Sequence, residues 1–357
     1  VDDVSTEQAK KFITAQHAAG RPSLTVLGFK TPHQPWAPPE RNRGLFSSNT
    51  AVAVPNLSVP PPFAPKANGG SSQTQLRDYM RTVVGIDQNV GDILALLDDL
   101  EIADNTAVIF ISDNGFFRGE HRLGDKRSAY EESLRIPLMI RYPAGQSKPL
   151  TVDPIALNVD IAPTILELAG VPVPESMQGR SLLPLIAGST PNDWRDSFIF
   201  SYNIDPEFPA AAVVPHLGLR RADGLKLVNY SDDTSWNELY DASRDGDPYE
   251  INNLYSLPER ADDLAAMKRE LVQTTERLGF MKASGFSMKP QGASWSVQGA
   301  DASLFKIETS SDLIDWQVVG TFEGGGTPTR LSLPVPGFSS SCLLYTSPSP
   351  RDLRTSR

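Results

Sequence analysis

The stretch TAVIFISDNGFFRGEHRLGDKRSAYEESLRIPLMIRYP, residues 106–143, decides the fold. Its apolar, β-branched run at 108–111 is typical of a strand that is buried on both faces of a sheet. The run ends at Ser112-Asp113-Asn114-Gly115, and open α/β sheets bind ligands beyond the carboxyl ends of such strands. Carboxylate and amide oxygens suit a hard cation such as Ca²⁺ or Mg²⁺. Alone, Asp-Asn-Gly is more often a simple turn, so the residues that follow decide between the two interpretations.

Two polar clusters follow this turn. Gly119-Glu120-His121 and Gly124-Asp125-Lys126 lie in a segment too rich in glycine for one regular helix. A loop that turns back here can bring Lys126 near Asp113. A second apolar run at 136–140 then predicts another strand, with Pro137 near its start, where a missing N–H is tolerated.

This ordered string resembles the type I sulfatase family of the alkaline phosphatase superfamily. The resemblance rests on the strand, Ser-Asp-Asn-Gly, Gly-Glu-His, the lysine, and Tyr130-Glu131-Glu132-Ser133-x-Arg135-Ile-Pro137. It extends over residues 20–280 and favours the iduronate-sulfatase-like branch. It implies an α/β fold with an alkaline-phosphatase-like mixed sheet flanked by helices, a small antiparallel α+β subdomain, and a short appended β region.

A histidine loop follows the apolar run at 23–29, which predicts a short strand. The prolines of Pro32-His33-Gln34-Pro35 hold the backbone of His33 extended, and a histidine at a strand end can exchange a proton at neutral pH. Without context, a histidine packed under Trp36 is the alternative. Sulfatases carry Pro-His-x-Pro after a strand with the histidine at the sulfate, so the resemblance implies this role for His33. Lys30 is a weaker candidate for a substrate contact.

The resemblance also implies a division of roles. Asp113 and Asn114 would give two oxygens to Ca²⁺, with Mg²⁺ as the alternative. Lys126 would neutralise charge on the transferring sulfate, and His33 would bind the sulfate or assist the leaving oxygen. We therefore expect His33 and Lys126 to be catalytic, and His33, Lys126, Lys30 and His121 to contact the substrate.

The nucleophile that this mechanism needs is not among the 357 residues. Sulfatases of this type use a formylglycine made from the first residue of Cys-x-Pro-Ser-Arg, and two further aspartates complete their Ca²⁺ site. The single cysteine, Cys342, stands in another context. We expect a truncated gene whose lost amino-terminal part held the nucleophile: an inactive piece of an enzyme that, when intact, removes sulfate from a sulfated sugar.

Two alternatives remain open. One is a phosphodiesterase or phosphonate hydrolase of the same superfamily, and the other is a non-catalytic protein that binds anions or glycans. The net charge of −10 argues against nucleic-acid binding, and it fits a polyanionic substrate only if basic residues gather at the site. No apolar run approaches the ~18 residues of a membrane helix. Location in the periplasm or outside the cell is an expectation from the family, and the oligomeric state is left open.

The chain divides into four expected segments. They are the remainder of the large sulfatase domain at 1–182, a carboxy-terminal subdomain at 183–280, an appended β module at 281–341, and a tail at 342–357 that resembles translated adapter sequence. The first segment contains a strong helical pattern, the apolar stripe at 76–100. Asp87 lies within this stripe, so we expect a hydrogen-bonded carboxylate in the core.

Overall fold

The computed structural model describes residues 1–145, 148–202, 214–230 and 233–278, together with the backbone of six strands between residues 286 and 348. The chain forms two compact units. The first unit comprises residues 1–61, 65–126 and 131–194, and the second comprises residues 62–64, 127–130 and 195–357. The sequence placed the corresponding division at residue 182.

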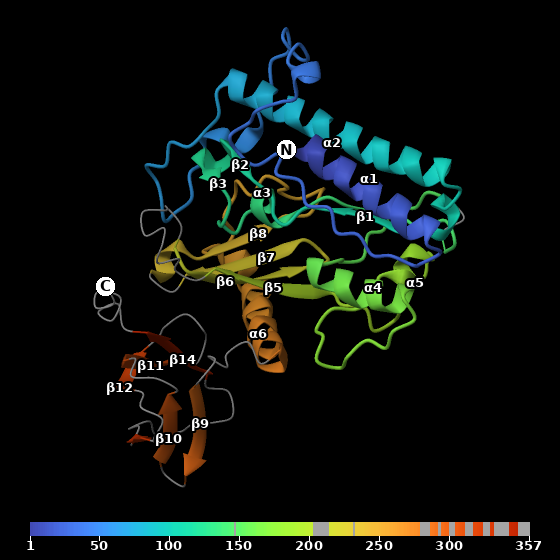
Figure 1. Cartoon of the computed structure of the whole chain (residues 1–357). Coiled ribbons are helices and arrows are strands. Elements are labelled where there is room, and N and C mark those ends of the chain that lie inside the picture. Colours follow the sequence, from blue (N-terminus) through green and yellow to red (C-terminus); the bar gives the residue numbers. More distant parts are fainter. Residues whose placement is uncertain are drawn as a thin grey trace. The chain divides into compact units, whose positions relative to one another are not determined.

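Two long helices of the first unit, α1 (Asp2–Ala18) and α2 (Gln73–Asp99), pack against each other (Figure 1). α2 confirms the helix predicted at 76–100, and it begins with a capping box in which Ser72 and Gln75 exchange side-chain and backbone hydrogen bonds. The prediction for Asp87 is wrong, because this residue is exposed. Asn89, which is 2% exposed, is the buried polar group of this helix.

The central strand pair consists of β1 (Val108–Ile111) and β4 (Leu138–Arg141), which run antiparallel with Val108 opposite Arg141. Both predicted strands are confirmed. The side chains of β1 are half-buried rather than buried on both faces. The remaining elements of this unit are short: η1 (Glu40–Asn42), η2 (Pro55–Ser58), η3 (Ala103–Asn105), β2 (Phe117–Arg118), η4 (Glu120–Arg122), β3 (Gly124–Asp125), α3 (Glu131–Leu134), η5 (Asn158–Asp160), α4 (Ile161–Leu168) and α5 (Leu183–Ile186).

The strand predicted at 23–29 does not form. These residues have no regular structure, and Leu24 and Val26 are 64% and 86% exposed. A strand needs a neighbour that satisfies its backbone N–H and C=O groups, and no strand among the described residues pairs with this segment. Apolar residues alone therefore did not suffice to make it a strand.

The second unit is built on a four-stranded antiparallel sheet in the order β5 (Ser197–Tyr202), β6 (His216–Arg221), β7 (Leu225–Tyr230), β8 (Glu238–Asp241). Gly224 has φ 109° in the hairpin between β6 and β7, a conformation that favours glycine. The helix α6 (Ala261–Leu278) packs on the sheet (Figure 1). The core between them contains Leu219, Leu227, Leu239, Met267 and Leu271, all 0% exposed. Two short 3-10 helices, η6 (Thr234–Trp236) and η7 (Pro258–Arg260), complete this part.

A buried polar cluster also belongs to the second unit. The Glu238 carboxylate accepts hydrogen bonds from the hydroxyls of Tyr130 (2.6 Å), Tyr230 (2.6 Å) and Tyr240 (2.8 Å). Lys226 forms an ion pair with Glu250, and both side chains are buried. Burial raises the pKa of Glu238, and the three hydroxyl donors counteract this effect because they stabilise the carboxylate.

Six further strands follow residue 285. β9 (Phe286–Gln291), β10 (Ser294–Gly299) and β13 (Thr329–Leu331) form one sheet, and β11 (Leu304–Ser310), β12 (Gln317–Glu323) and β14 (Leu343–Pro348) form another. The β11–β12 pair lies within the segment 281–341, for which the sequence predicted an appended β module. β14 lies in the stretch that we set aside as a tail, and it pairs with β11. Cys342 lies outside the described residues.

Candidate functional site

The turn after β1 presents two oxygens that are free to bind a ligand. Asn114 N donates to Asp113 Oδ1 (2.9 Å), and Asn114 Nδ2 donates to the carbonyl of Gly115 (2.7 Å). This leaves Asp113 Oδ2 and Asn114 Oδ1 without a hydrogen-bond partner in the described part of the chain. Asp113 is exposed and Asn114 half-buried. A carboxylate and an amide oxygen on consecutive residues fit a hard divalent cation.

Gly115 fixes this turn against α3. Its N–H donates to the carbonyl of Ser133 (2.9 Å). A Cβ on Gly115 would lie 1.9 Å from the carbonyl oxygen of Glu132, which no side chain tolerates. The close approach of the two backbones therefore requires glycine at this position.

The segment after the turn reverses direction, as predicted. β2 and β3 pair antiparallel with Phe117 opposite Asp125 and Arg118 opposite Gly124, and Lys126 follows directly. Lys126 is half-buried, and its ammonium group has no hydrogen bond or ion pair to any residue that the structure describes. A half-buried cation without a counter-ion is suited to an anionic ligand. That Lys126 and Asp113 face one cavity stays a prediction.

His33 and Lys30 lie together on the surface. Lys30 Nζ is 3.2 Å from His33 Nδ1, and the same nitrogen is 2.7 Å from the carbonyl oxygen of Gln34. The shorter contact favours the tautomer in which Nδ1–H donates to Gln34. His33 Nε2 is then the ring nitrogen available to a ligand, and both side chains are exposed.

His121 has a different environment. Its side chain is 1% exposed, and Nδ1 is 3.2 Å from the carbonyl of Val59. This contact ties η4 to the proline-rich loop that precedes α2. Its predicted contact with the substrate is untested, and the observed contact is a structural one.

The sequence did not single out Arg118 or Asp2. The guanidinium carbon of Arg118 lies 3.9 Å from the ring centroid of Trp36 and 4.6 Å from that of Tyr79. Asp2 is 9% exposed and binds the backbone of residues 30 and 31. The only signals were an arginine directly after two phenylalanines and an aspartate at the start of a helix, and both patterns are common.

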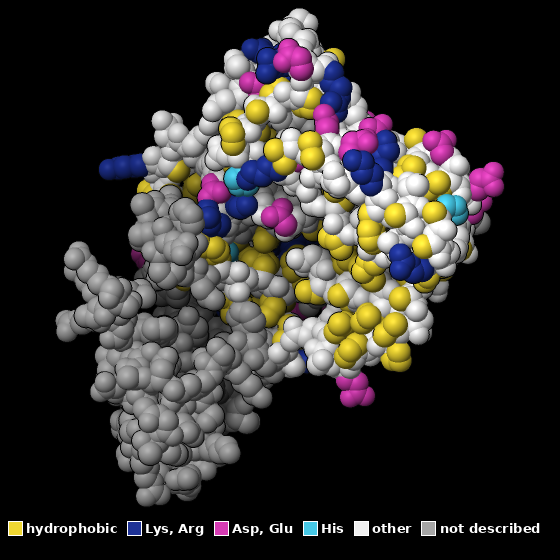
Figure 2. All heavy atoms as spheres, viewed as in Figure 1, with side chains coloured by type: hydrophobic (Ala, Val, Ile, Leu, Met, Phe, Trp, Pro, Cys, Tyr) yellow, Lys and Arg dark blue, Asp and Glu magenta, His cyan; other side chains and the backbone are white. Residues whose placement is uncertain are grey.

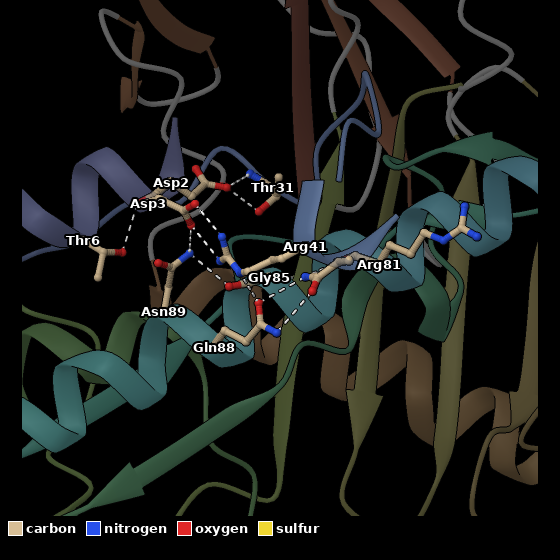
Figure 3. A network of polar contacts seen from close by, with 10 residues as sticks. Asp2, Asp3, Thr6, Thr31, Arg41, Arg81, Gly85, Gln88 and Asn89 are labelled. Atoms are coloured by element: carbon tan, nitrogen blue, oxygen red, sulfur yellow. Dashed lines mark hydrogen bonds and ion pairs between the residues drawn. The ribbon is translucent and has the colours of Figure 1, made fainter. Parts of the chain in front are cut away.

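Next to Asp2, an open hollow between α1 and α2 is lined by polar residues (Figure 3). Arg41 donates to both Asp3 oxygens (2.7 and 2.9 Å) and to Gln88 (2.6 Å), and Asn89 donates to Asp3 (3.0 Å). The hydrogen bond from Arg41 lowers the pKa of Asp3 to about 2. The polar groups in this hollow are therefore largely paired with one another, as in a structural network.

Charge and hydropathy set further limits. On the face shown in Figure 2, Lys and Arg side chains lie interspersed with Asp and Glu rather than in one continuous basic surface. Among the helices of the described residues, none combines the length and the apolarity needed to cross a membrane.

Two family models match the chain. One, described as sulfatase, matches residues 1–171, and the other, described as the carboxy-terminal part of N-sulphoglucosamine sulphohydrolase, matches residues 119–277. Together they cover both the candidate site and the sheet of the second unit.

Individual proteins similar to this chain are also sulfatases. An N-acetylglucosamine-6-O-sulfatase of Bacteroides thetaiotaomicron is 42% identical over 207 residues, which are 57% of this chain and 35% of that protein. An ulvan-active sulfatase of Formosa agariphila is 28% identical over 257 residues, 71% of this chain and 48% of that protein. The chain thus spans about a third to a half of the length of these relatives.

Among solved structures, that of BT4656 in complex with its substrate D-glucosamine-2-N,6-O-disulfate superposes with a TM-score of 0.72 and 28% sequence identity. The superposition covers 79% of this chain and 70% of that protein. The predicted alkaline-phosphatase-like α/β fold is thereby confirmed.

Proposed function

Because the chain belongs to the sulfatase family of the alkaline-phosphatase-like superfamily, we propose that this protein is a sulfuric ester hydrolase that acts on a sulfated carbohydrate. The relatives named above support a 6-O-sulfated glucosamine unit as the substrate. The iduronate-sulfatase-like branch, which the sequence motifs favoured, stays a prediction. Export to the periplasm or beyond the cell is part of the same proposal.

The metal would be held in part by Asp113 and Asn114. Sulfatases of this family generally use a metal ion, and the two free oxygens on consecutive residues suit Ca²⁺, or Mg²⁺ in second place. When bound, the cation polarises the sulfate ester and stabilises the oxyanion of the nucleophile. Two oxygens are fewer than the six to eight that Ca²⁺ prefers, so we expect weak binding of metal by these residues alone.

Three further side chains would act on the sulfate. Lys126 neutralises its charge, because the ammonium group has no counter-ion among the described residues. In its doubly protonated form the His33 ring would keep the hydrogen bond to Gln34 through Nδ1–H and donate another from Nε2–H to a sulfate oxygen or to the leaving oxygen. Lys30, 3.2 Å from the His33 ring, adds positive charge at the same place, and the predicted substrate contact of His121 would require this buried ring to line the sugar site.

One observation in the segment 112–126 carries this proposal. The side-chain oxygens of Asp113 and Asn114 are free to bind a metal ion, and they are followed by the half-buried Lys126, which has no counter-ion among the described residues. The nucleophile would be a formylglycine. Its Cys-x-Pro-Ser-Arg motif is not among residues 1–357, so we expect no release of sulfate from an aryl sulfate by this chain. Robust turnover would contradict the assignment of the nucleophile.

Binding can be tested on the chain itself by isothermal titration calorimetry with D-glucosamine 6-sulfate in the presence of Ca²⁺. We expect binding that weakens about tenfold in Lys126→Gln, because about 1.4 kcal/mol of charge-assisted hydrogen bonding is lost. Lys11→Gln, which removes an exposed lysine from α1, is the matched control. Equal affinity for unsulfated glucosamine, or unchanged affinity in Lys126→Gln, would contradict the proposal.

The two alternatives predict other outcomes. Tighter binding of a phosphonate monoester than of the sulfate ester would favour a phosphonate hydrolase. The genomic DNA upstream of the codon for Val1 separates an enzyme from a non-catalytic glycan-binding protein. An in-frame Cys-x-Pro-Ser-Arg supports the enzyme, and a natural start codon near Val1 supports the binding protein.

A further inference from the structure

The loop that carries His33 is irregular, yet both of its ends are fixed from outside. Within the loop, His33 N donates to the carbonyl of Lys30 (3.1 Å), and Trp36 Nε1 donates to the carbonyl of Pro32 (2.9 Å). These bonds fold the loop on itself, but they do not fix its place on the rest of the first unit. Contacts with distant parts of the sequence do this.

The first contact is made by Asp2 at the start of α1. Asp2 Oδ1 accepts from Lys30 N (2.8 Å), and Oδ2 accepts from Thr31 N (3.2 Å) and Thr31 Oγ1 (2.5 Å), as Figure 3 shows for the threonine. One nearly buried carboxylate thus holds two successive backbone amides. The neighbouring Asp3 is paired with Arg41, so the helix end that supplies this carboxylate is itself anchored.

The second contact is made by Arg118 at the other end of the loop. Its guanidinium carbon lies 3.9 Å from the centroid of the Trp36 ring, and Trp36 also meets Phe116 edge to face at 6.4 Å. All three guanidinium nitrogens are buried without a hydrogen-bond acceptor in the described part of the chain. Desolvation by burial lowers the pKa of Arg118.

An arginine in this position is costly for stability alone. A buried donor without an acceptor loses its hydration, and Arg118 gains in return the cation–π contacts and the attraction of the Glu120 charge. A methionine would fill the same space between aromatic rings without this penalty. The placement of Arg118 suggests another use, because its backbone pairs with Gly124, two residues before Lys126.

We propose that Asp2 and Arg118 are positioning residues of the candidate sulfate site. Asp2 sets the start of the His33 loop, and Arg118 holds its end against the β2–β3 ribbon that leads into Lys126. The two predicted sulfate ligands, His33 and Lys126, are thereby kept in a fixed relation before any ligand arrives. This inference rests on the proposed function for its purpose, although the two contacts are independent of it.

The test for Asp2 compares Asp2→Asn with the exposed Asp87→Asn. The amide cannot accept from all three donors, so we expect the Thr31 amide proton to exchange with solvent about tenfold faster by NMR, and the His33 ring signals to shift. Affinity for D-glucosamine 6-sulfate should fall about tenfold, equivalent to about 1.4 kcal/mol. Unchanged Thr31 exchange and His33 signals in a folded Asp2→Asn chain would overturn the proposal.

The test for Arg118 compares Arg118→Met, Arg118→Lys and the exposed Arg21→Met. We expect Arg118→Met to shift the Trp36 indole and His33 signals and to weaken binding about tenfold, while Arg118→Lys, which keeps a cation over the ring, restores most of both. Full binding by Arg118→Met would overturn the role of Arg118. If Arg118→Met does not fold, Arg118→Lys decides. Trp36 and His33 signals that move away from their native positions in a folded Arg118→Lys chain would show that a cation is not what holds the loop.

Failure of the proposed function is distinguishable from failure of this inference. If the unaltered chain does not bind D-glucosamine 6-sulfate, the function is contradicted. The exchange rate of the Thr31 amide and the signals of Trp36 and His33 still report whether Asp2 and Arg118 position the loop.

Discussion

The two units hold their strands in different ways. Every residue of β7 in the second unit is buried, whereas every residue of β1 in the first unit is half-buried. The second unit closes an apolar core between its sheet and α6. In the first unit, Asp2 and the Asp3–Arg41 ion pair tie helices to loops. Apolar packing stabilises a fold without fixing directions, whereas hydrogen bonds specify where a loop lies. The candidate site residues lie in the first unit, where such polar contacts position the loops.

The largest effect should come from truncation in the second core. Leu239→Ala should lower the free energy of unfolding of the second unit by about 3 kcal/mol, because it leaves a cavity at a site that is 0% exposed. Met139→Ala in β4 is the matched change in the first unit, and at 60% exposure it should cost less than about 0.5 kcal/mol. Hydrogen exchange in urea, resolved by peptide, measures both. Equal costs would remove the contrast between the units.

A pH-dependent change in the free energy of unfolding, of similar size, should arise in the second unit. Burial lowers the pKa of His216 from 6.5 to about 4, so the folded state keeps this ring neutral where the unfolded chain protonates it. Its stabilising contribution is complete above pH 6.5 and is lost as the pH falls to about 4, which amounts to about 3 kcal/mol. His216→Phe should abolish this difference.

The comparison is made by urea unfolding of His216→Phe and the unaltered chain at pH 7 and pH 4. Glu238 is present in both proteins, so its raised pKa cancels. A parallel loss of stability in the two proteins between these pH values would show that His216 is not responsible.

A smaller effect is expected for the polar network of the first unit. Asp3→Asn should lower its free energy of unfolding by about 0.5–1 kcal/mol at pH 7, because the ion pair with Arg41 is about half exposed and screened. The contribution of Asp3 is present above pH 3.8 and fades as the pH falls to about 2. Chemical unfolding monitored in the first unit measures it, and a cost above about 3 kcal/mol would mean that polar contacts outweigh packing there.

Much of the fold followed from local pattern. The helix of the apolar stripe at 76–100 and the strands at 108–111 and 136–140 could be predicted, because each depends on a residue pattern within a short segment. The absence of a strand at 23–29 could not be predicted, because a strand forms only where a neighbouring strand pairs with it, and the sequence of the segment does not reveal that neighbour. Asp87 failed for a related reason: a stripe of 3.6-residue period does not say which polar residue at its border turns inward.

The candidate site was predicted in part. Four site residues could be predicted because their residue types and spacing suit the binding of a cation and of sulfate: Asp113, Asn114, Lys126 and His33. Asp2 and Arg118 could not, since their roles arise from contacts 28 and more residues away. Positioning residues carry no chemistry of their own that a motif would display.

Gly115 has a consequence for anyone who wishes to redesign this protein. Because the backbone of Glu132 occupies the space where a side chain would begin, mutational libraries around the turn should vary its neighbours and leave this position fixed. The same crowding means that Asp113 and Asn114 cannot be moved independently of α3. New specificity is more accessible from the irregular loops than from the end of the strand.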